Sequence, residues 1–175
     1  MVKSSRNISI CAIFGALQII FLLCAKYLEI ITISFYALTS LALMIPFTQK
    51  MYKEGMLTYV AVSILSVFLV GIPECLVYVT ISGGFTLIFI LFKEKKIKPF
   101  VSISIEIIFA NLVLLLFYSF FNSFIAIDLT KLNFGIEKIE FYHYAIITTI
   151  LAILLDCFLR FAYKYLKMYA DRLFK

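Results

Sequence analysis

The sequence is poor in charge and in the side chains that most catalytic sites need. Only 15% of its 175 residues are charged, His143 is its single histidine, and tryptophan is absent. Soluble domains carry about 25% charged residues, so this chain lacks the polar side chains needed to cover a water-exposed surface. A single histidine also excludes a metal site or a proton relay built from several histidines.

The cysteines are few and scattered, at positions 11, 24, 75 and 157. They form no C-x-x-C pair, so we expect small apolar residues in helices and no metal or redox site. The sequence contains no paired nucleophile and base, no glycine-rich phosphate loop and no ATP-binding motif. It therefore predicts a protein that is not an enzyme and that carries no cofactor.

Apolar residues are abundant instead, at 64% of the chain, and the mean hydropathy is +1.07. Polar breaks divide the chain into six apolar segments, each close to the 20 or so residues that a helix needs to cross a bilayer. A membrane β-barrel would show alternating hydrophobicity in segments of about ten residues. We therefore expect an all-α, integral membrane six-helix bundle that forms one transmembrane domain over residues 1–175. The expected spans are 8–25, 30–48, 56–72, 75–92, 99–122 and 141–163.

Lysine and arginine are unevenly divided between the two sides that these spans define. One side holds 13 of the 16 basic residues, and the other side holds Lys26, Lys131 and Lys138. Because basic residues accumulate on the cytoplasmic side, both termini are expected in the cytoplasm. The abundance of isoleucine, lysine and asparagine suggests an AT-rich bacterial genome, so we expect the chain in a bacterial plasma membrane. The net charge of +6 then needs no nucleic-acid partner, since it lies beside anionic lipid.

Polar residues inside the expected spans are candidates for function, because burying them in lipid is costly unless something pairs with them. Asn111, Tyr118 and Asn122 are spaced i, i+7 and i+11, which places them on one stripe of the fifth helix. The stripe would suit a polar or heterocyclic ligand, and it would equally suit hydrogen bonds between helices.

Four further residues are candidate substrate contacts near the outer membrane surface. Glu74 and Tyr78 share a face at the start of the fourth span, and His143 and Tyr144 begin the sixth. Gly83 lies further along the fourth span, beside a second glycine, and this pair indicates close helix contact or a kink.

Three charged residues lie near the cytoplasmic ends of the last two spans. Asp156 and Arg160 are spaced i, i+4 and can pair with each other, and Glu106 could join them. We favour a structural or partner-facing role for Glu106. An alternative is a small gradient-driven carrier that uses this carboxylate to couple uptake to protons.

Small residues recur in the first span, where Ala12, Gly15 and Ala16 replace the large side chains expected against lipid. Small residues let two membrane helices approach closely. The motif Ala12-Ile-Phe-Gly-Ala16, in a six-span chain without an ATPase, resembles the S component of energy-coupling factor (ECF) vitamin transporters. The segment 33–69 is also similar to the second and third helices of that family, in which an apolar helix ends in a short turn with glycine and lysine before the next helix begins.

The resemblance implies a substrate-binding subunit that captures a vitamin or related micronutrient from outside the cell. It implies docking through Ala12, Gly15 and Ala16 to a transmembrane coupling protein, which two cytoplasmic ATPases drive. In this family, ligand contacts come mainly from helices four to six and the outer loops. The main alternative is a non-catalytic scaffold of the cell-wall machinery, similar to the rod-shape proteins of the MreD type.

Overall fold

The protein is all-α in the part that the computed structural model describes, which is the backbone of residues 2–124 and 141–173 and the side chains of 5–28, 30–117 and 143–169. The helices follow the apolar runs, because a bilayer-spanning segment must satisfy its backbone hydrogen bonds internally. Their bounds in chain order are α1 Val2–Tyr27, η1 Glu29–Ile31, α2 Thr32–Thr48, α3 Tyr52–Leu69, α4 Ile72–Val77, η2 Tyr78–Ser82, α5 Gly83–Glu94, α6 Pro99–Phe124 and α7 Phe141–Leu173.

Three of these elements, α4, the π-helical turn η2 and α5, form one continuous rod, Ile72–Glu94. The described residues therefore contain six rods, and the expected bundle of six helices is confirmed. Five of the six rods are long and apolar enough to cross a membrane, and α2 is shorter, at 17 residues. The chain is therefore a multi-pass membrane protein. The last helix runs on to Leu173, well beyond the predicted end at 163. Hydropathy marks where a helix leaves the hydrocarbon, whereas the helix itself continues through good helix formers such as Lys164 and Lys167.

Gly71 and Pro73 form the turn between α3 and α4. Gly71 adopts a φ of +119°, a conformation that glycine reaches without a Cβ clash, and Pro73 lies in the first turn of α4. The expected break between the third and fourth spans is confirmed, although α4 begins at Ile72 rather than at 75.

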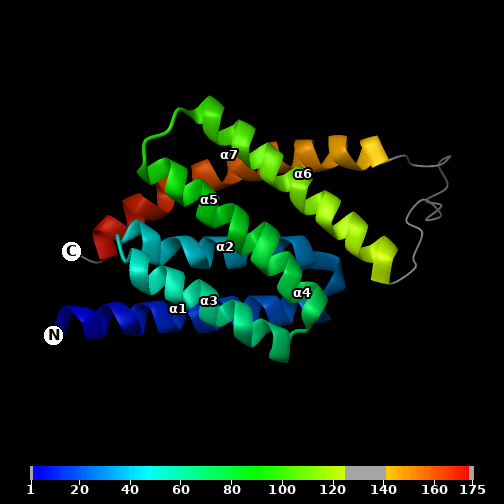
Figure 1. Cartoon of the computed structure of the whole chain (residues 1–175). Coiled ribbons are helices and arrows are strands. Elements are labelled where there is room, and N and C mark those ends of the chain that lie inside the picture. Colours follow the sequence, from blue (N-terminus) through cyan, green and yellow to red (C-terminus); the bar gives the residue numbers. More distant parts are fainter. Residues whose placement is uncertain (1, 125–140, 174–175) are drawn as a thin grey trace.

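Helix α2 is central to the bundle and packs against α1, α3, α5 and α7. Helices α1 and α3 lie side by side, and α6 packs against α5 and α7 (Figure 1). The first three helices thus form one group and the last three rods another, with α2 in contact with both. The starts of α1 and α6, the end of α7 and the α2–α3 connection lie at one end of the molecule (Figure 1).

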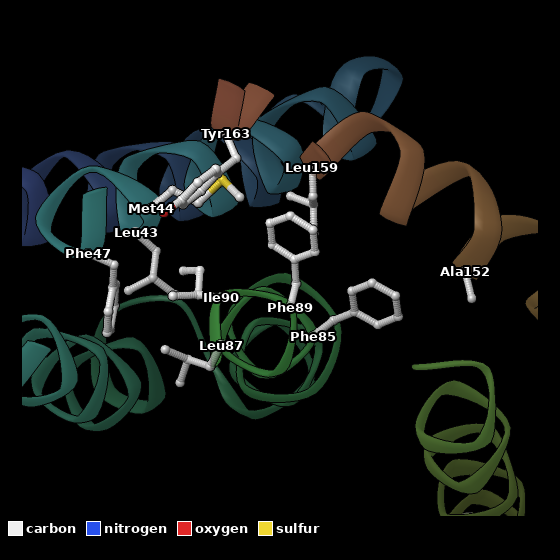
Figure 2. Close-up of a cluster of buried hydrophobic side chains, with 10 residues drawn as sticks. All are labelled: Leu43, Met44, Phe47, Phe85, Leu87, Phe89, Ile90, Ala152, Leu159 and Tyr163. Carbon is white, nitrogen blue, oxygen red and sulfur yellow. The ribbon is translucent and has the colours of Figure 1, made fainter. Parts of the chain in front are cut away.

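The main core lies where α2, α5 and α7 meet. Figure 2 shows its side chains, with Phe89 directed from α5 towards Leu159 on α7. The rings of Phe89 and Tyr163 are edge to face, with centroids 6.1 Å apart. Many other large apolar side chains are exposed, including Ile30, Ile33 and Phe68. In a bilayer these face lipid, so their exposure is compatible with a membrane protein.

Candidate functional site

An apolar cavity of about 200 Å³ lies between η2, α5, α6 and α7. Three phenylalanines, Phe85, Phe109 and Phe117, form much of its wall. Of the lining residues that the structure describes, only Thr80 and Thr148 are polar. The cavity therefore suits a small, largely apolar molecule that makes one or two hydrogen bonds.

The π-helical turn η2 forms one side of this cavity, and two glycines follow it. Tyr59 on α3 packs against Gly83, where a Cβ atom would overlap the tyrosine ring. The Tyr59 hydroxyl donates a hydrogen bond of 2.9 Å to the carbonyl oxygen of Val79, inside the turn. Gly83 thus permits close contact with α3, one of the two roles that the sequence suggested for the glycine pair. Single π-helical turns are frequent at functional sites.

Tyr78, a predicted substrate contact, lies in the protein core. Its side chain is fully buried, and its hydroxyl donates a hydrogen bond of 2.7 Å to Oε1 of Gln18 on α1. Gln18 in turn donates through Nε2 to the carbonyl oxygen of Phe14. This pair ties the fourth rod to the first helix. The sequence analysis did not single out Gln18, although a glutamine in an apolar span is a signal of such a bond.

Glu74, the neighbouring prediction, is half-buried beside the α3–α4 turn. Lys26 from the end of α1 donates to the carbonyl oxygen of Val70 in the same turn. Both charged side chains reach the space around Gly71, where a Cβ atom would lie 3.2 Å from Oε2 of Glu74 and 3.8 Å from Nζ of Lys26. Glu74 therefore lies at the turn, apart from the described lining of the apolar cavity.

Asn111 connects two helices. Its Nδ2 donates hydrogen bonds to the carbonyl oxygen of Ile107, at 3.0 Å, and to Oγ1 of Thr149 on α7, at 3.1 Å. The sequence left open a ligand contact or a hydrogen bond between helices, and the observed geometry of Asn111 is the second of these. The side chains of Tyr118 and Asn122 lie outside the described residues, so the predicted stripe stays a prediction.

His143 is exposed and Tyr144 is half-buried at the start of α7. The described lining of the apolar cavity includes neither of them, and it includes none of Glu74, Tyr78 and Asn111. Their predicted roles as substrate contacts remain predictions. The lining residues Thr80 and Thr148 were not singled out from the sequence, because single threonines are unremarkable in membrane helices.

A charged cluster joins α6 to α7 between the apolar cavity and the basic end. Arg160 donates through Nε to Oδ2 of Asp156, at 2.6 Å, so the predicted pair is confirmed. Arg160 also donates through Nη2 to Oγ of Ser102, at 3.4 Å, and Ser102 donates to Oε1 of Glu106, at 2.7 Å. Glu106 thus joins the pair through Ser102. The sequence analysis missed Ser102, whose i, i+4 spacing to Glu106 is the available signal.

A groove with a volume of about 610 Å³ runs between α1 and α3. All three residues predicted to dock a coupling protein line it. Gly15 is buried, and a Cβ atom there would lie 3.0 Å from Cγ2 of Thr58, so this glycine lets α3 approach α1. Ala12 and Ala16 are exposed and present a surface of small side chains to the outside.

The chain was also compared with known proteins. No protein-family model matches it, and neither a curated protein nor a solved structure matches it.

Proposed function

We propose that the protein is the membrane-embedded, substrate-binding subunit of an ECF-type importer. The observation that carries this proposal is the α1–α3 groove, where Ala12 and Ala16 are exposed beside a hollow of about 610 Å³. The groove and the apolar cavity lie in different halves of the bundle. That separation matches a subunit that binds its substrate in one half and its partner in the other.

The groove fits a helix of the coupling protein. Two alanines one helical turn apart leave room for close backbone approach, which is the main source of helix association in lipid. Ala61 on α3 adds a third small side chain to the same lining. Lys53 and Glu54 lie at one end of the groove and offer charged groups to a partner near the membrane surface.

The apolar cavity is the proposed substrate site. It is bounded by the fourth, fifth and sixth rods, the part of the chain in which the resemblance expects ligand contacts. Its volume of about 200 Å³ is below the roughly 300 Å³ at which small-molecule sites usually begin. The substrate is therefore a small vitamin or related micronutrient, or else α6 and α7 separate to admit it.

The proposed orientation places the end that holds the start of α1 and the end of α7 in the cytoplasm. The α2–α3 turn carries Lys50, and Lys53 follows in the first turn of α3. The α5–α6 connection carries Lys95, Lys96 and Lys98. These basic segments support the assignment through the positive-inside rule. The two partner ATPases would then lie on the basic side.

The groove is tested by co-purification with a coupling protein and its two ATPases. The wild-type chain is expected to retain the three partners, and Ala12→Leu/Ala16→Leu is expected to lose them, because leucine fills the space a partner helix needs. The matched control is Ile13→Phe/Ile20→Phe, which adds bulk at exposed positions of α1 outside the groove. Equal retention of the partners by the wild type and both double variants would contradict docking through the groove.

A further inference from the structure

The charged cluster between α6 and α7 is more deeply buried than its composition would suggest. Glu106 and Asp156 are each only 1% exposed. Both belong to helices long and apolar enough to span a membrane. Buried carboxylates in such helices are rare and are generally paired or functional.

Each of these two carboxylates has one oxygen that the hydrogen bonds of the cluster leave unsatisfied. Oε1 of Glu106 accepts from Ser102, and Oδ2 of Asp156 accepts from Arg160. Among the described residues, Oε2 of Glu106 and Oδ1 of Asp156 are buried without a hydrogen-bond partner. Arg160 and Ser102 connect the two carboxyl groups, because Arg160 donates both to Asp156 and to Ser102, and Ser102 donates to Glu106. Two buried carboxylates that share one arginine would repel each other, whereas one bound proton would remove that repulsion.

The charges of the cluster also indicate one bound proton. Arg160 is the cation that the described contacts bring to the two carboxylates, so the fully ionised cluster would carry one uncompensated negative charge. An unpaired charge is costly in a medium of low dielectric constant. Helix α2 has no charged residue. Helix α5 brings Lys93, whose exposed side chain is at the rim of a neighbouring cavity, and Glu94, whose exposed side chain accepts a hydrogen bond from Tyr163. One bound proton makes the cluster neutral.

That neighbouring cavity connects the cluster to the basic end of the molecule. Its volume is about 260 Å³, and its lining includes Lys93, Lys96, Ser102 and Arg160. Two members of the cluster therefore border a space that water can fill. Ser102 is bonded to Glu106 and Arg160 to Asp156, so each carboxyl group is one side chain away from this space.

We propose that Glu106 and Asp156 form a proton-binding site that holds one proton at the carboxyl oxygens left without a partner, Oε2 of Glu106 and Oδ1 of Asp156. The site holds α6 against α7. Ala152 and Leu155, which line the apolar cavity, lie within one turn of Asp156 on α7. Removal of the proton thus loosens the two helices that form one wall of that cavity. This inference stands independently of the proposed transport function.

The test is infrared spectroscopy of the full chain in detergent, which detects the C=O stretch of a protonated carboxyl group. The wild type is expected to show this band at neutral pH and to lose it as the pH is raised. Glu106→Gln and Asp156→Asn are expected to lack the band. The matched control Glu94→Gln is expected to keep it, because Glu94 is exposed and accepts from Tyr163 outside the cluster.

Isotope labelling keeps the test decisive if a variant does not fold. Wild-type chain is prepared with ¹³C at the side-chain carboxyl carbon of glutamate, and a second preparation carries the label in aspartate. The band is expected to shift in at least one preparation. A wild type without the band at neutral pH, or a band that Glu106→Gln leaves unchanged, would overturn the proposal. Loss of the band on adding sodium at constant pH would identify a cation site instead and would also overturn it.

Discussion

Tyr78 and Gln18 meet in the core through one hydrogen bond, and neither side chain is exposed. Removing the tyrosine hydroxyl leaves Oε1 of Gln18 buried without its donor. The cost of an unsatisfied buried acceptor is about 1–3 kcal/mol. This bond gives Tyr78 a structural role that the sequence alone did not reveal, because its partner is 60 positions away.

We predict that Tyr78→Phe lowers the free energy of unfolding in detergent by about 1–2 kcal/mol, within the range of such bonds in membrane proteins. Thermal unfolding followed by circular dichroism measures the change. Tyr27→Phe is the control, since Tyr27 is 74% exposed. Equal stability of the two variants would show that the hydrogen bond contributes nothing.

The hydrogen bond between Asn111 and Thr149 gives a second prediction. Asn111→Ala and Thr149→Val each remove one partner of the 3.1 Å contact between α6 and α7. A double-mutant cycle is expected to show a coupling energy of about 0.6 kcal/mol, the average for such pairs in a membrane protein. Strict additivity of the two variants would instead mean that the contact does not hold the helices together.

Among the elements, the fourth rod departs most from an ideal helix. Its π-helical turn η2 lies between α4 and α5, and Tyr59 donates a hydrogen bond into it. The sequence predicted close helix contact or a kink at Gly83 and the glycine beside it. The widened turn was not predicted, because the hydrogen bond into it comes from a helix that is distant in sequence.

Gly83→Ala is predicted to destabilise this element by about 1–3 kcal/mol, the usual cost of overpacking. The added methyl group would overlap the ring of Tyr59 and lie 3.0 Å from the carbonyl oxygen of Tyr78. Leu91→Ala on α5 is the control, because Leu91 is exposed. Chemical denaturation measures both variants, and a Gly83→Ala chain as stable as the wild type would contradict the close contact.

For the molecule as a whole, the sequence predicted the helical class and the six rods, since hydropathy and length follow directly from the bilayer. The charged pair on α7 was also predictable, because Asp156 and Arg160 are four residues apart on one helix. The apolar cavity and the α1–α3 groove were not. Both arise between helices that are distant in sequence, and periodicity within one helix does not specify its neighbours.

The proposed orientation makes a prediction for the intact chain. In a background without native cysteines, Tyr27→Cys is expected to react with a membrane-impermeant thiol reagent in intact cells. Lys50→Cys is expected to react only after the cells are broken, because the α2–α3 turn would face the cytoplasm. Both positions are exposed, so access of the reagent decides the result. The reverse pattern would invert the proposed topology.

The central claim, that the chain is the substrate-binding subunit of an ECF-type importer, is tested most directly by native mass spectrometry. The wild-type chain would be co-expressed with the coupling protein and ATPases of its own host and released from detergent in the spectrometer. We expect a complex of one chain, one coupling protein and two ATPases. A folded chain that appears alone or only as copies of itself, while the other three proteins remain assembled, would contradict it.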